Sequence, residues 1–360
     1  MKRILISGYL GFDNFGDEAL LYVLIRDLLQ TGFKNTDITV ISDNPNKTAT
    51  NYYVNTVNRW NILEVIASIV NCNAIFFVGG LFQDKRSFQS FLYYYLQLLL
   101  SNFLKKEVVF YGSGIGPFQR KVTMDLFNSA IKNHHLITVR DKASANLFIN
   151  KPNIQITCDP VWSIEGDFTF QNQIQTVNWQ LPIVGVSLRN DKLLKIEKIN
   201  DIGDKLLRLL SAMKDWQVLL IPCMPEQDLH VIYELYDFMI KKTTEKNRII
   251  LLENFSYFSI TQQAGILASC DVMVGMRYHS LLVPLANGKP VFGLIYDQKV
   301  RSLIEFASQS SVFFKDIIDQ PWSYFWQNLQ NASDLARQAQ EKASELHKIN
   351  LQLLERLMNL

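Results

Sequence analysis

Short apolar runs alternate along the chain with longer segments in which apolar residues recur every three or four positions. The runs are rich in β-branched residues and do not alternate strictly with polar ones, as expected of strands covered on both faces of a parallel sheet. They occupy residues 4–6, 38–41, 74–78, 108–111, 136–139, 154–157, 183–188, 218–221, 249–252, 272–274 and 291–295. Helical spacing is clearest at residues 17–30, 88–104, 121–133, 200–213 and 227–240. This alternation predicts an α/β fold built from doubly wound parallel sheets.

The alternation pauses once, in a stretch rich in Gln, Asn and Thr that ends at Pro182. A chain of 360 residues is also too long for one ordinary core. We therefore predict two Rossmann-like domains facing a cleft, at residues 1–165 and 183–330, joined by a linker at 166–182. Residues 331–360 are expected to form a C-terminal helix with one apolar face. Packing against a domain is the simplest interpretation of that face, and contact with a membrane or partner is the alternative.

Composition narrows the functional class. Lys and Arg total 36 against 34 Asp and Glu, so a net charge of +2 excludes the broad basic field that nucleic-acid binding requires. The four cysteines have no metal-ligand or disulfide-framework spacing, and we expect free thiols in a reducing cytoplasm and no metal site. No uncharged apolar stretch is long enough to span a bilayer. Any anion recognition must therefore be local.

Ligands of open α/β sheets bind outside the carboxyl ends of the strands, and the residues that follow the predicted strands are glycines and ionisable side chains. The first such loop, GYLGFDNFGDE at residues 8–18, lacks both the dinucleotide-binding spacing and the lysine of a P-loop. Asp17 is positioned to cap the following helix. The loop is either a tight turn or a backbone cradle for a sugar or diphosphate.

Two arginines follow strands at equivalent places in the two halves. Arg140 stands beside Asp141, and this pair either caps the next helix or presents a planar guanidinium to a carboxylate or phosphate. Arg189 repeats the placement after the first strand of the second half.

The most informative stretch is Arg277-Tyr278-His279, which lies between a strand and an apolar helix. A histidine at this edge is suited to general acid–base chemistry because its pKa lies near neutral pH. Lys299 follows the next strand end, so Arg277, His279 and Lys299 are predicted to converge. Two cations beside a proton donor suit a small, dense anion.

Eight segments, taken together and in this order, resemble the polysaccharide pyruvyl transferase family, which includes bacterial cell-wall pyruvyl transferases. They are GYLGFDNFGDEA at residues 8–19, GGLFQD at 79–84, GIGP at 114–117, TVRD at 138–141, DP at 159–160, VSLR at 186–189, VGMRYH at 274–279 and YDQKV at 296–300. The resemblance implies a glycosyltransferase-B-like fold and phosphoenolpyruvate as the donor in place of a nucleotide sugar.

The resemblance also implies roles for the matching residues. The product would be pyruvate joined to a sugar as a cyclic ketal, with no cofactor or metal. The N-terminal domain would bind the acceptor and the C-terminal domain the donor. The implied donor-site and catalytic residues are Arg140, His279 and Lys299, with Arg277 and Arg189 assisting. The implied acceptor-side residues are Gly11, Asn14, Gly16, Asp17, Gly80, Gln83 and Asp84.

The acceptor implied by the resemblance is a cell-envelope glycan or its lipid-linked precursor, which would place the enzyme in the cytoplasm, at the inner face of the membrane for a lipid-linked acceptor. Residues 91–106 are aromatic and apolar and end in two lysines, so they either contact lipid or form a buried helix. The alternative functions are a nucleotide-sugar-dependent glycosyltransferase of the same fold and a non-catalytic sugar- or anion-binding module. The oligomeric state is left open.

Overall fold

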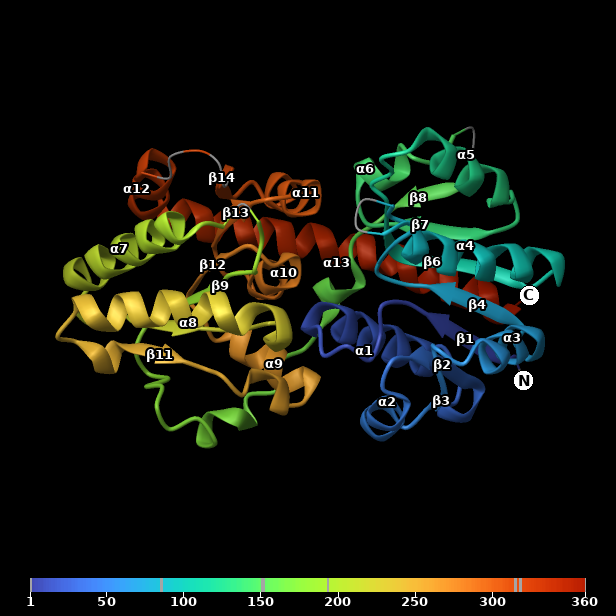
Figure 1. The fold of residues 1–360 in the computed structure, drawn as a ribbon, viewed down its shortest axis with the longest axis horizontal. Helices are drawn as coiled ribbons and strands as arrows, with labels where there is room; N and C mark the ends of the chain where they lie inside the picture. The colour runs from blue at the N-terminus through green and yellow to red at the C-terminus, as the bar shows by residue number, and fades with distance from the viewer. Residues whose placement is uncertain are drawn as a thin grey trace. The chain divides into compact units, whose positions relative to one another are not determined.

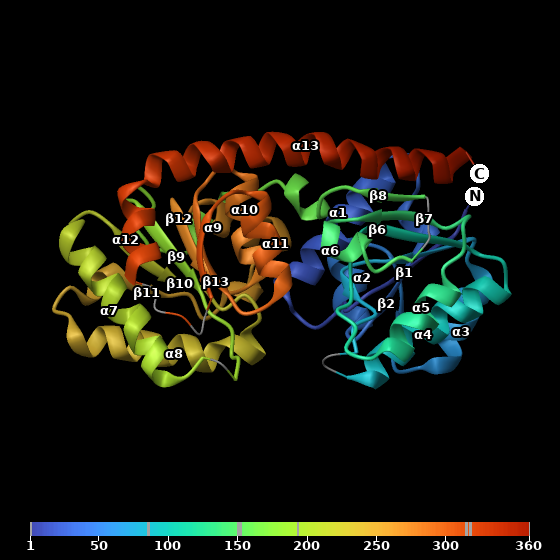
Figure 2. The same cartoon turned by 90° about the horizontal axis from the view of Figure 1, so that it is seen from above.

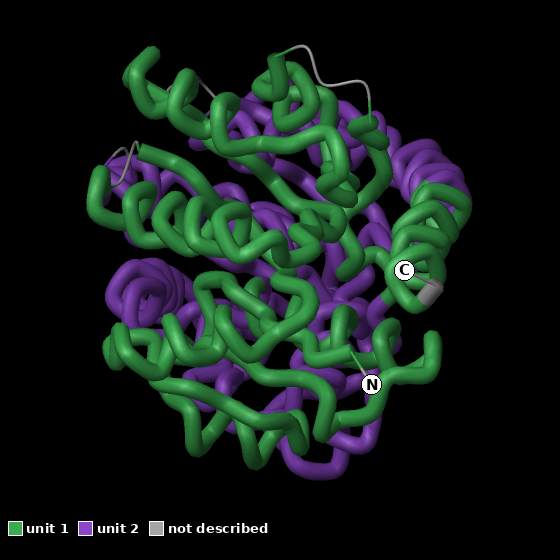
Figure 3. Tube along the Cα trace, turned by 90° about the vertical axis from the view of Figure 1, so that its right-hand side faces the viewer, with its two compact units in different colours: residues 1–12, 17–163, 343–360 green, residues 13–16, 164–342 purple. Residues whose placement is uncertain are grey.

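The computed structural model describes residues 2–84, 87–149, 153–192, 194–313, 316 and 319–359. Met1, which begins the predicted domain 1–165, and Leu360, which ends the predicted helix 331–360, lie outside the described residues. Strands and helices alternate along the chain (Figure 1). The chain forms two compact units, coloured separately in Figure 3. Unit 1 contains Met1–Phe12, Asp17–Ser163 and Ala343–Leu360, and unit 2 contains Asp13–Gly16 and Ile164–Lys342.

Unit 1 is built on a parallel sheet with the strand order β3-β2-β1-β4-β6-β7-β8, and β5 pairs with β6. Its strands are β1 (Ile4–Ser7), β2 (Ile38–Ser42), β3 (Asn55–Asn58), β4 (Ala74–Phe77), β5 (Gly80–Leu81), β6 (Glu107–Ile115), β7 (Leu136–Val139) and β8 (Ile154–Ile156). The six apolar runs predicted in this half are all confirmed as strands. β3 was not predicted, because its sequence NTVN is polar and it lies at the sheet edge, where its outer residues are exposed.

The helices of unit 1 connect these strands. They are α1 (Phe15–Gln30), α2 (Pro45–Tyr52), α3 (Ile62–Asn71), α4 (Phe88–Phe103), α5 (Lys121–Ala130) and α6 (Lys142–Ala145), with short 3-10 turns η1 (Asn35–Asp37) and η2 (Pro160–Ser163). Side-chain hydrogen bonds from Asn44, Asn61 and Ser87 to backbone amides begin α2, α3 and α4. One hydrophobic cluster joins the inner faces of α3, α4 and α5 to β4 and β6.

Unit 2 is a second parallel sheet, with the order β11-β10-β9-β12-β13-β14. Its strands are β9 (Ile183–Ser187), β10 (Gln217–Leu220), β11 (Ile249–Leu251), β12 (Val272–Gly275), β13 (Val291–Ile295) and β14 (Ser310–Phe313). Its helices are α7 (Ile196–Ala212), α8 (Pro225–Lys242), α9 (Ile260–Ala268), α10 (Tyr278–Ala286), α11 (Gln298–Phe306) and α12 (Asp319–Gln327), with 3-10 turns η3 (Thr169–Asn172), η4 (Lys246–Arg248) and η5 (Phe255–Tyr257). The stretch 166–182, expected to be a linker, packs within unit 2, where Phe170 of η3 is completely buried.

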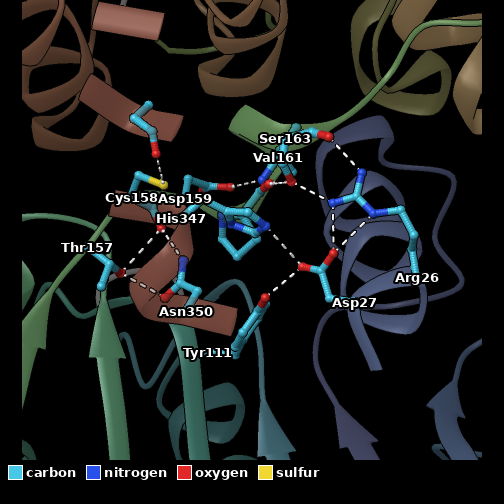
Figure 4. Close-up of polar contacts among 12 residues, drawn as sticks. Arg26, Asp27, Tyr111, Thr157, Cys158, Asp159, Val161, Ser163, His347 and Asn350 are labelled. Atoms are coloured by element: carbon cyan, nitrogen blue, oxygen red, sulfur yellow. Dashed lines mark hydrogen bonds and ion pairs between the residues drawn. The ribbon is translucent and has the colours of Figure 1, made fainter. Parts of the chain in front are cut away.

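The last helix, α13 (Leu329–Asn359), contributes residues to both units, and its last part is anchored to unit 1 by buried polar groups (Figure 4). Asp27 of α1 is fully buried, accepts a hydrogen bond from the Tyr111 hydroxyl at 2.6 Å and lies 3.3 Å from Nε2 of His347. Burial alone would raise the pKa of Asp27, but His347, Arg26 and Tyr111 together lower it. No helix of the described ranges is both long and apolar enough to cross a membrane.

Asn350 is the second anchor of α13 in unit 1. Its side chain is fully buried, accepts from the Thr157 hydroxyl at 2.9 Å and donates to the Cys158 carbonyl at 3.2 Å. Both partners sit at the end of β8, so this one amide joins the C-terminal helix to the edge of the sheet (Figure 4).

We predict that Asn350→Leu lowers the free energy of unfolding by about 1–3 kcal/mol, because it leaves the Cys158 carbonyl without its amide donor in a site closed to water. Chemical denaturation followed by circular dichroism measures the change. Gln352→Leu, at an exposed position of the same helix, is the matched control and should be nearly neutral. Equal effects of the two variants would contradict the anchoring role of Asn350.

Candidate functional site

The parallel register of unit 2 brings two arginines to the same edge of its sheet. Ser187 at the end of β9 pairs with Gly275 at the end of β12. Arg189 and Arg277 each follow two residues later. Because parallel strands end at one edge, equivalent positions after neighbouring strands lie side by side there.

Arg277 is buried and is held by a carboxylate from α8. Its Nε donates to Asp228 Oδ2 at 3.0 Å and its Nη2 donates to Asp228 Oδ1. Asp228 is fully buried and also accepts from the Met224 amide at 2.9 Å. Burial alone would lower the pKa of Arg277, but the opposed carboxylate raises it, so the guanidinium is charged. The pair fixes the start of α10, because Arg277 is the residue immediately before that helix.

Arg189 is held by the neutral side chain of Tyr296. Its Nη1 donates to the Tyr296 hydroxyl at 3.1 Å, and its guanidinium lies 5.2 Å from the centroid of that ring. Burial raises the pKa of Tyr296, so its hydroxyl stays protonated. No acidic side chain among the described residues forms an ion pair with Arg189, and its buried Nε has no hydrogen-bond acceptor in that part of the chain. This half-buried cation is suited to holding an anionic ligand.

His279 lies in the first turn of α10 and packs directly on Gly16. A Cβ atom at Gly16 would stand 1.9 Å from His279 Nδ1, so only glycine leaves room for the ring. Gly16 belongs to the segment Asp13–Gly16 of unit 2, in which the Phe15 amide donates to the Cys223 carbonyl at 3.1 Å. The Phe15 ring also meets Phe255 edge-on at 5.8 Å. The first glycine loop therefore sets the position of the histidine.

Lys299 lies in the first turn of α11, directly after β13. Asp297 caps this turn by accepting from the Val300 amide at 3.0 Å. Since β13 neighbours β12 in the sheet, Lys299 follows the strand end next to the one that carries Arg277 and His279. Lys299 and His279 are both half-buried. Asn14, another predicted site residue, also belongs to unit 2.

Arg140 belongs to unit 1, where its side chain is 3% exposed and forms an ion pair with the fully buried Asp159 at 2.8 Å. Its Nε lies 3.5 Å from Asp141, and the guanidinium rests on Gly114, where a Cβ atom would come within 2.7 Å of it. The sequence left open whether Arg140 and Asp141 form a pair that caps the next helix or whether Arg140 binds a ligand. Asp141 does cap α6, by accepting from the Ser144 amide at 2.7 Å, and Arg140 pairs with Asp159 as well, while a contact with the donor stays a prediction.

The predicted acceptor-side residues of unit 1 are held mainly by contacts within their own loops. Gly11 has a positive φ of 84° and donates its amide to Glu18 at 2.7 Å. The Gly80 carbonyl accepts from the Gln83 amide group at 3.3 Å. α1 begins at Phe15, so the expectation that Asp17 precedes and caps this helix is wrong, and Asp17 lies within its first turn.

Asp84 has a clear structural task. Its carboxylate accepts from the Gln119 amide at 2.6 Å, the Arg120 amide at 3.0 Å and the Thr123 hydroxyl at 2.7 Å, which together hold the start of α5. Burial would raise the pKa of Asp84, but these three hydrogen bonds outweigh it and lower the pKa. The carboxylate therefore stabilises unit 1 above about pH 4, and this contribution is lost as pH falls through the lowered pKa.

Sequence reasoning did not single out Asp228 or the role of Tyr296. Asp228 lies in the first turn of α8, which follows β10, so the strand-end rule could have included it. Tyr296 stood within a quoted motif, but its contact with Arg189 joins residues far apart in the chain. The described residues contain no group of three or more His, Cys, Asp or Glu side chains able to hold a metal ion.

Two parallel-sheet α/β domains of this kind form a glycosyltransferase-B-like fold. One similar solved structure is S. aureus MnaA in a co-structure with UDP, with a TM-score of 0.63 and 13% identity over 100% of this chain and 95% of that one. Neisseria meningitidis UDP-GlcNAc 2-epimerase bound to UDP-GlcNAc has a TM-score of 0.62 and 11% identity over 100% of both chains. Anabaena HepE in complex with UDP-glucose has a TM-score of 0.59 and 13% identity over 100% of both chains. At these identities the likeness concerns the fold alone.

The family model for polysaccharide pyruvyl transferase matches residues 14–298, and the chain belongs to this family. Membership indicates a pyruvyl transferase enzyme. A search of curated proteins found no match.

We predict that Gly16→Ala destabilises the protein by about 1–3 kcal/mol, because its methyl group overlaps the His279 ring and forces it to move. In a His279→Ala background the same change should cost much less, since the obstructing ring is gone. Denaturant unfolding of the two single variants and the double variant gives the coupling between the sites. Additive effects would show that Gly16 acts independently of His279.

Proposed function

We propose that this protein transfers the pyruvyl group of phosphoenolpyruvate to two hydroxyls of a sugar, forming a cyclic ketal. The observation that carries the proposal is the group of Arg189, Arg277, His279 and Lys299 at one edge of the unit 2 sheet. Asp228 neutralises Arg277, while Arg189 has no carboxylate partner among the described residues. Arg189 therefore contributes a positive charge that suits a small anionic ligand.

Phosphoenolpyruvate fits this charge because it carries a phosphate and a carboxylate a few ångströms apart. We propose that Lys299 binds one of these groups and that Arg189 contributes a second cation. Arg277 assists mainly by holding the start of α10, since its guanidinium already donates two hydrogen bonds to Asp228. The family resemblance also assigns a donor contact to Arg140. Arg140→Ala tests that contact poorly, because the variant would leave Asp159 buried without its partner.

The proposed reaction adds a proton to C3 of the enol, which makes C2 resemble an oxocarbenium ion. One sugar hydroxyl adds to C2, the C2–O bond to phosphate breaks, and the second hydroxyl then closes the ketal. Of the two hydroxyl protons lost, one balances the proton gained at C3 and the other leaves with inorganic phosphate. We propose His279 as the general acid–base in these transfers, a role worth about 10²–10⁴-fold in rate. Arg and Lys side chains would stabilise the charge on the departing phosphate.

The proposed acceptor is a cell-envelope glycan or its lipid-linked precursor, bound on the side of unit 1. The loops that support this assignment carry Gly11, Asp17, Gly80 and Gln83 at the carboxyl edge of its sheet. Phosphoenolpyruvate is a cytoplasmic metabolite, so we propose that the reaction takes place in the cytoplasm.

We predict that Arg189→Gln weakens binding of phosphoenolpyruvate by about 10- to 100-fold, as expected for the loss of a charged hydrogen-bond donor. Isothermal titration calorimetry measures the change, with Arg208→Gln as a control at an exposed position of α7. A parallel titration with UDP-N-acetylglucosamine tests the alternative donor. Binding of the nucleotide sugar without binding of phosphoenolpyruvate would favour a glycosyltransferase instead.

We predict that His279→Gln retains phosphoenolpyruvate binding and loses turnover by about 10²–10⁴-fold, because the glutamine cannot exchange a proton at neutral pH. Release of inorganic phosphate in the presence of an acceptor glycan reports turnover, and calorimetry on the same sample reports donor binding. Turnover equal to that of the wild type would remove His279 from the chemistry.

A further inference from the structure

The outer face of α4 is an apolar stripe. Its exposed side chains follow one another at intervals of four, four, three and four residues, which places them on one side of a helix. They are Phe88 (43% exposed), Leu92 (37%), Leu96 (54%), Leu99 (38%) and Phe103 (82%). The opposite side of the helix is buried in the core of unit 1 through Phe91, Tyr94, Tyr95 and Leu98. No residue of α4 is charged.

The two neighbouring helices extend this face. α3 and α5 lie on either side of α4 (Figures 1 and 2). Their exposed apolar residues are Ile62 (67%), Leu63 (79%), Ile66 (41%), Val70 (48%), Val122 (66%) and Leu126 (37%). Their inner residues, Val65 and Ile69 of α3 and Phe127 of α5, already fill the core. The packing of the domain therefore does not require the outer residues to be apolar.

Unit 2 provides an internal comparison. α7 and α8 pack on the β9–β10 part of its sheet through the second hydrophobic cluster of the protein, much as α3, α4 and α5 pack on β4 and β6. The large apolar residues that α7 and α8 expose are Ile196 and Tyr233. Two similarly placed sets of helices thus differ sharply in how apolar their outer faces are. Contiguous exposed apolar patches of this kind mark interaction surfaces.

Basic side chains flank both ends of the α4 stripe. Lys105 and Lys106 follow its C-terminal end, and Lys106 Nζ donates to the Val70 carbonyl of α3 at 2.7 Å. Arg120 and Lys121 are exposed at the start of α5, and the Arg120 guanidinium lies 5.3 Å from the Phe88 ring at the beginning of α4. The exposed acidic residues on the three helices are Glu64 and Asp125.

We propose that this face, made of the outer residues of α3, α4 and α5, binds the surface of an anionic bilayer. The helices would lie in the plane of the interface, with their apolar side chains among the lipid headgroups and acyl chains and the flanking lysines and arginines beside acidic headgroups. Charge favours a bilayer over a second copy of this chain, because a two-fold interface would oppose two identical faces with like charges at the ends of each stripe. The proposal does not depend on the donor chemistry.

Flotation of the purified full-length protein with vesicles tests the proposal. We expect binding to vesicles of phosphatidylcholine mixed with phosphatidylglycerol, and much weaker binding to phosphatidylcholine alone. The double variant Leu96→Glu with Phe103→Glu should reduce the bound fraction at least about tenfold, because it places two charges in the apolar stripe. The matched control is Ile196→Glu with Tyr257→Glu, two unit 2 positions with exposed fractions of 47% and 87%, and it should bind as the wild type does.

Charge-reversal variants distinguish electrostatic attraction to acidic lipids from non-specific hydrophobic adsorption. Lys105→Glu with Lys121→Glu should weaken binding to the acidic vesicles, and Lys241→Glu with Lys246→Glu, at exposed unit 2 positions, should not. Absence of wild-type binding, or equal effects of test and control pairs, would overturn the proposal. Sedimentation equilibrium that shows a dimer lost in the Leu96→Glu, Phe103→Glu variant would assign the face to a second copy instead. Phosphoenolpyruvate titration of each variant confirms an intact donor site and keeps this outcome separate from the donor proposal.

Discussion

The buried pair between Arg277 and Asp228 is the interaction on which the candidate site depends. Two parallel hydrogen bonds join the residue before α10 to the first turn of α8, and a fully buried carboxylate cannot be left without its cation. The start of α10 is thereby fixed, and with it the place of His279, two residues further on. The Gly16 backbone then closes against the histidine ring. A helix start, a salt bridge and a glycine thus hold one imidazole in position.

Charge is distributed unevenly among the arginines at the strand ends. Arg140 in unit 1 and Arg277 in unit 2 each face a fully buried aspartate, so most of their charge is used within the protein. Arg189 instead meets the neutral hydroxyl and ring of Tyr296. The same two-domain scaffold occurs in proteins solved with UDP or UDP-sugars, so the fold does not decide the donor. Membership in the pyruvyl transferase family distinguishes this chain from them, and Arg189 and Lys299 are the cations that we propose for its donor site.

The outer faces of the helices differ between the two units in the number of large apolar residues that they expose. Helices that cover a sheet need only one apolar side, and α7 and α8 satisfy this rule with few large apolar residues exposed. α3, α4 and α5 depart from it, with an apolar outer face and basic residues at its ends. Local packing does not explain this departure, because the inner faces of the same helices are already complete. The bilayer contact that we propose for this face would explain it.

The sequence by itself determined the fold class, most strands of both sheets and the edge at which ionisable residues collect. The exceptions are the polar edge strand β3, the short strand β5 and the C-terminal strand β14. Apolar runs and strand-end residues are local patterns, and parallel topology makes them sufficient for these conclusions. Only the tertiary structure decided that Arg140 meets Asp159, that Asp84 caps α5 and that Gly16 makes room for His279. These contacts join residues 19 to 263 positions apart. Their partners are selected by packing and burial, which no local pattern encodes.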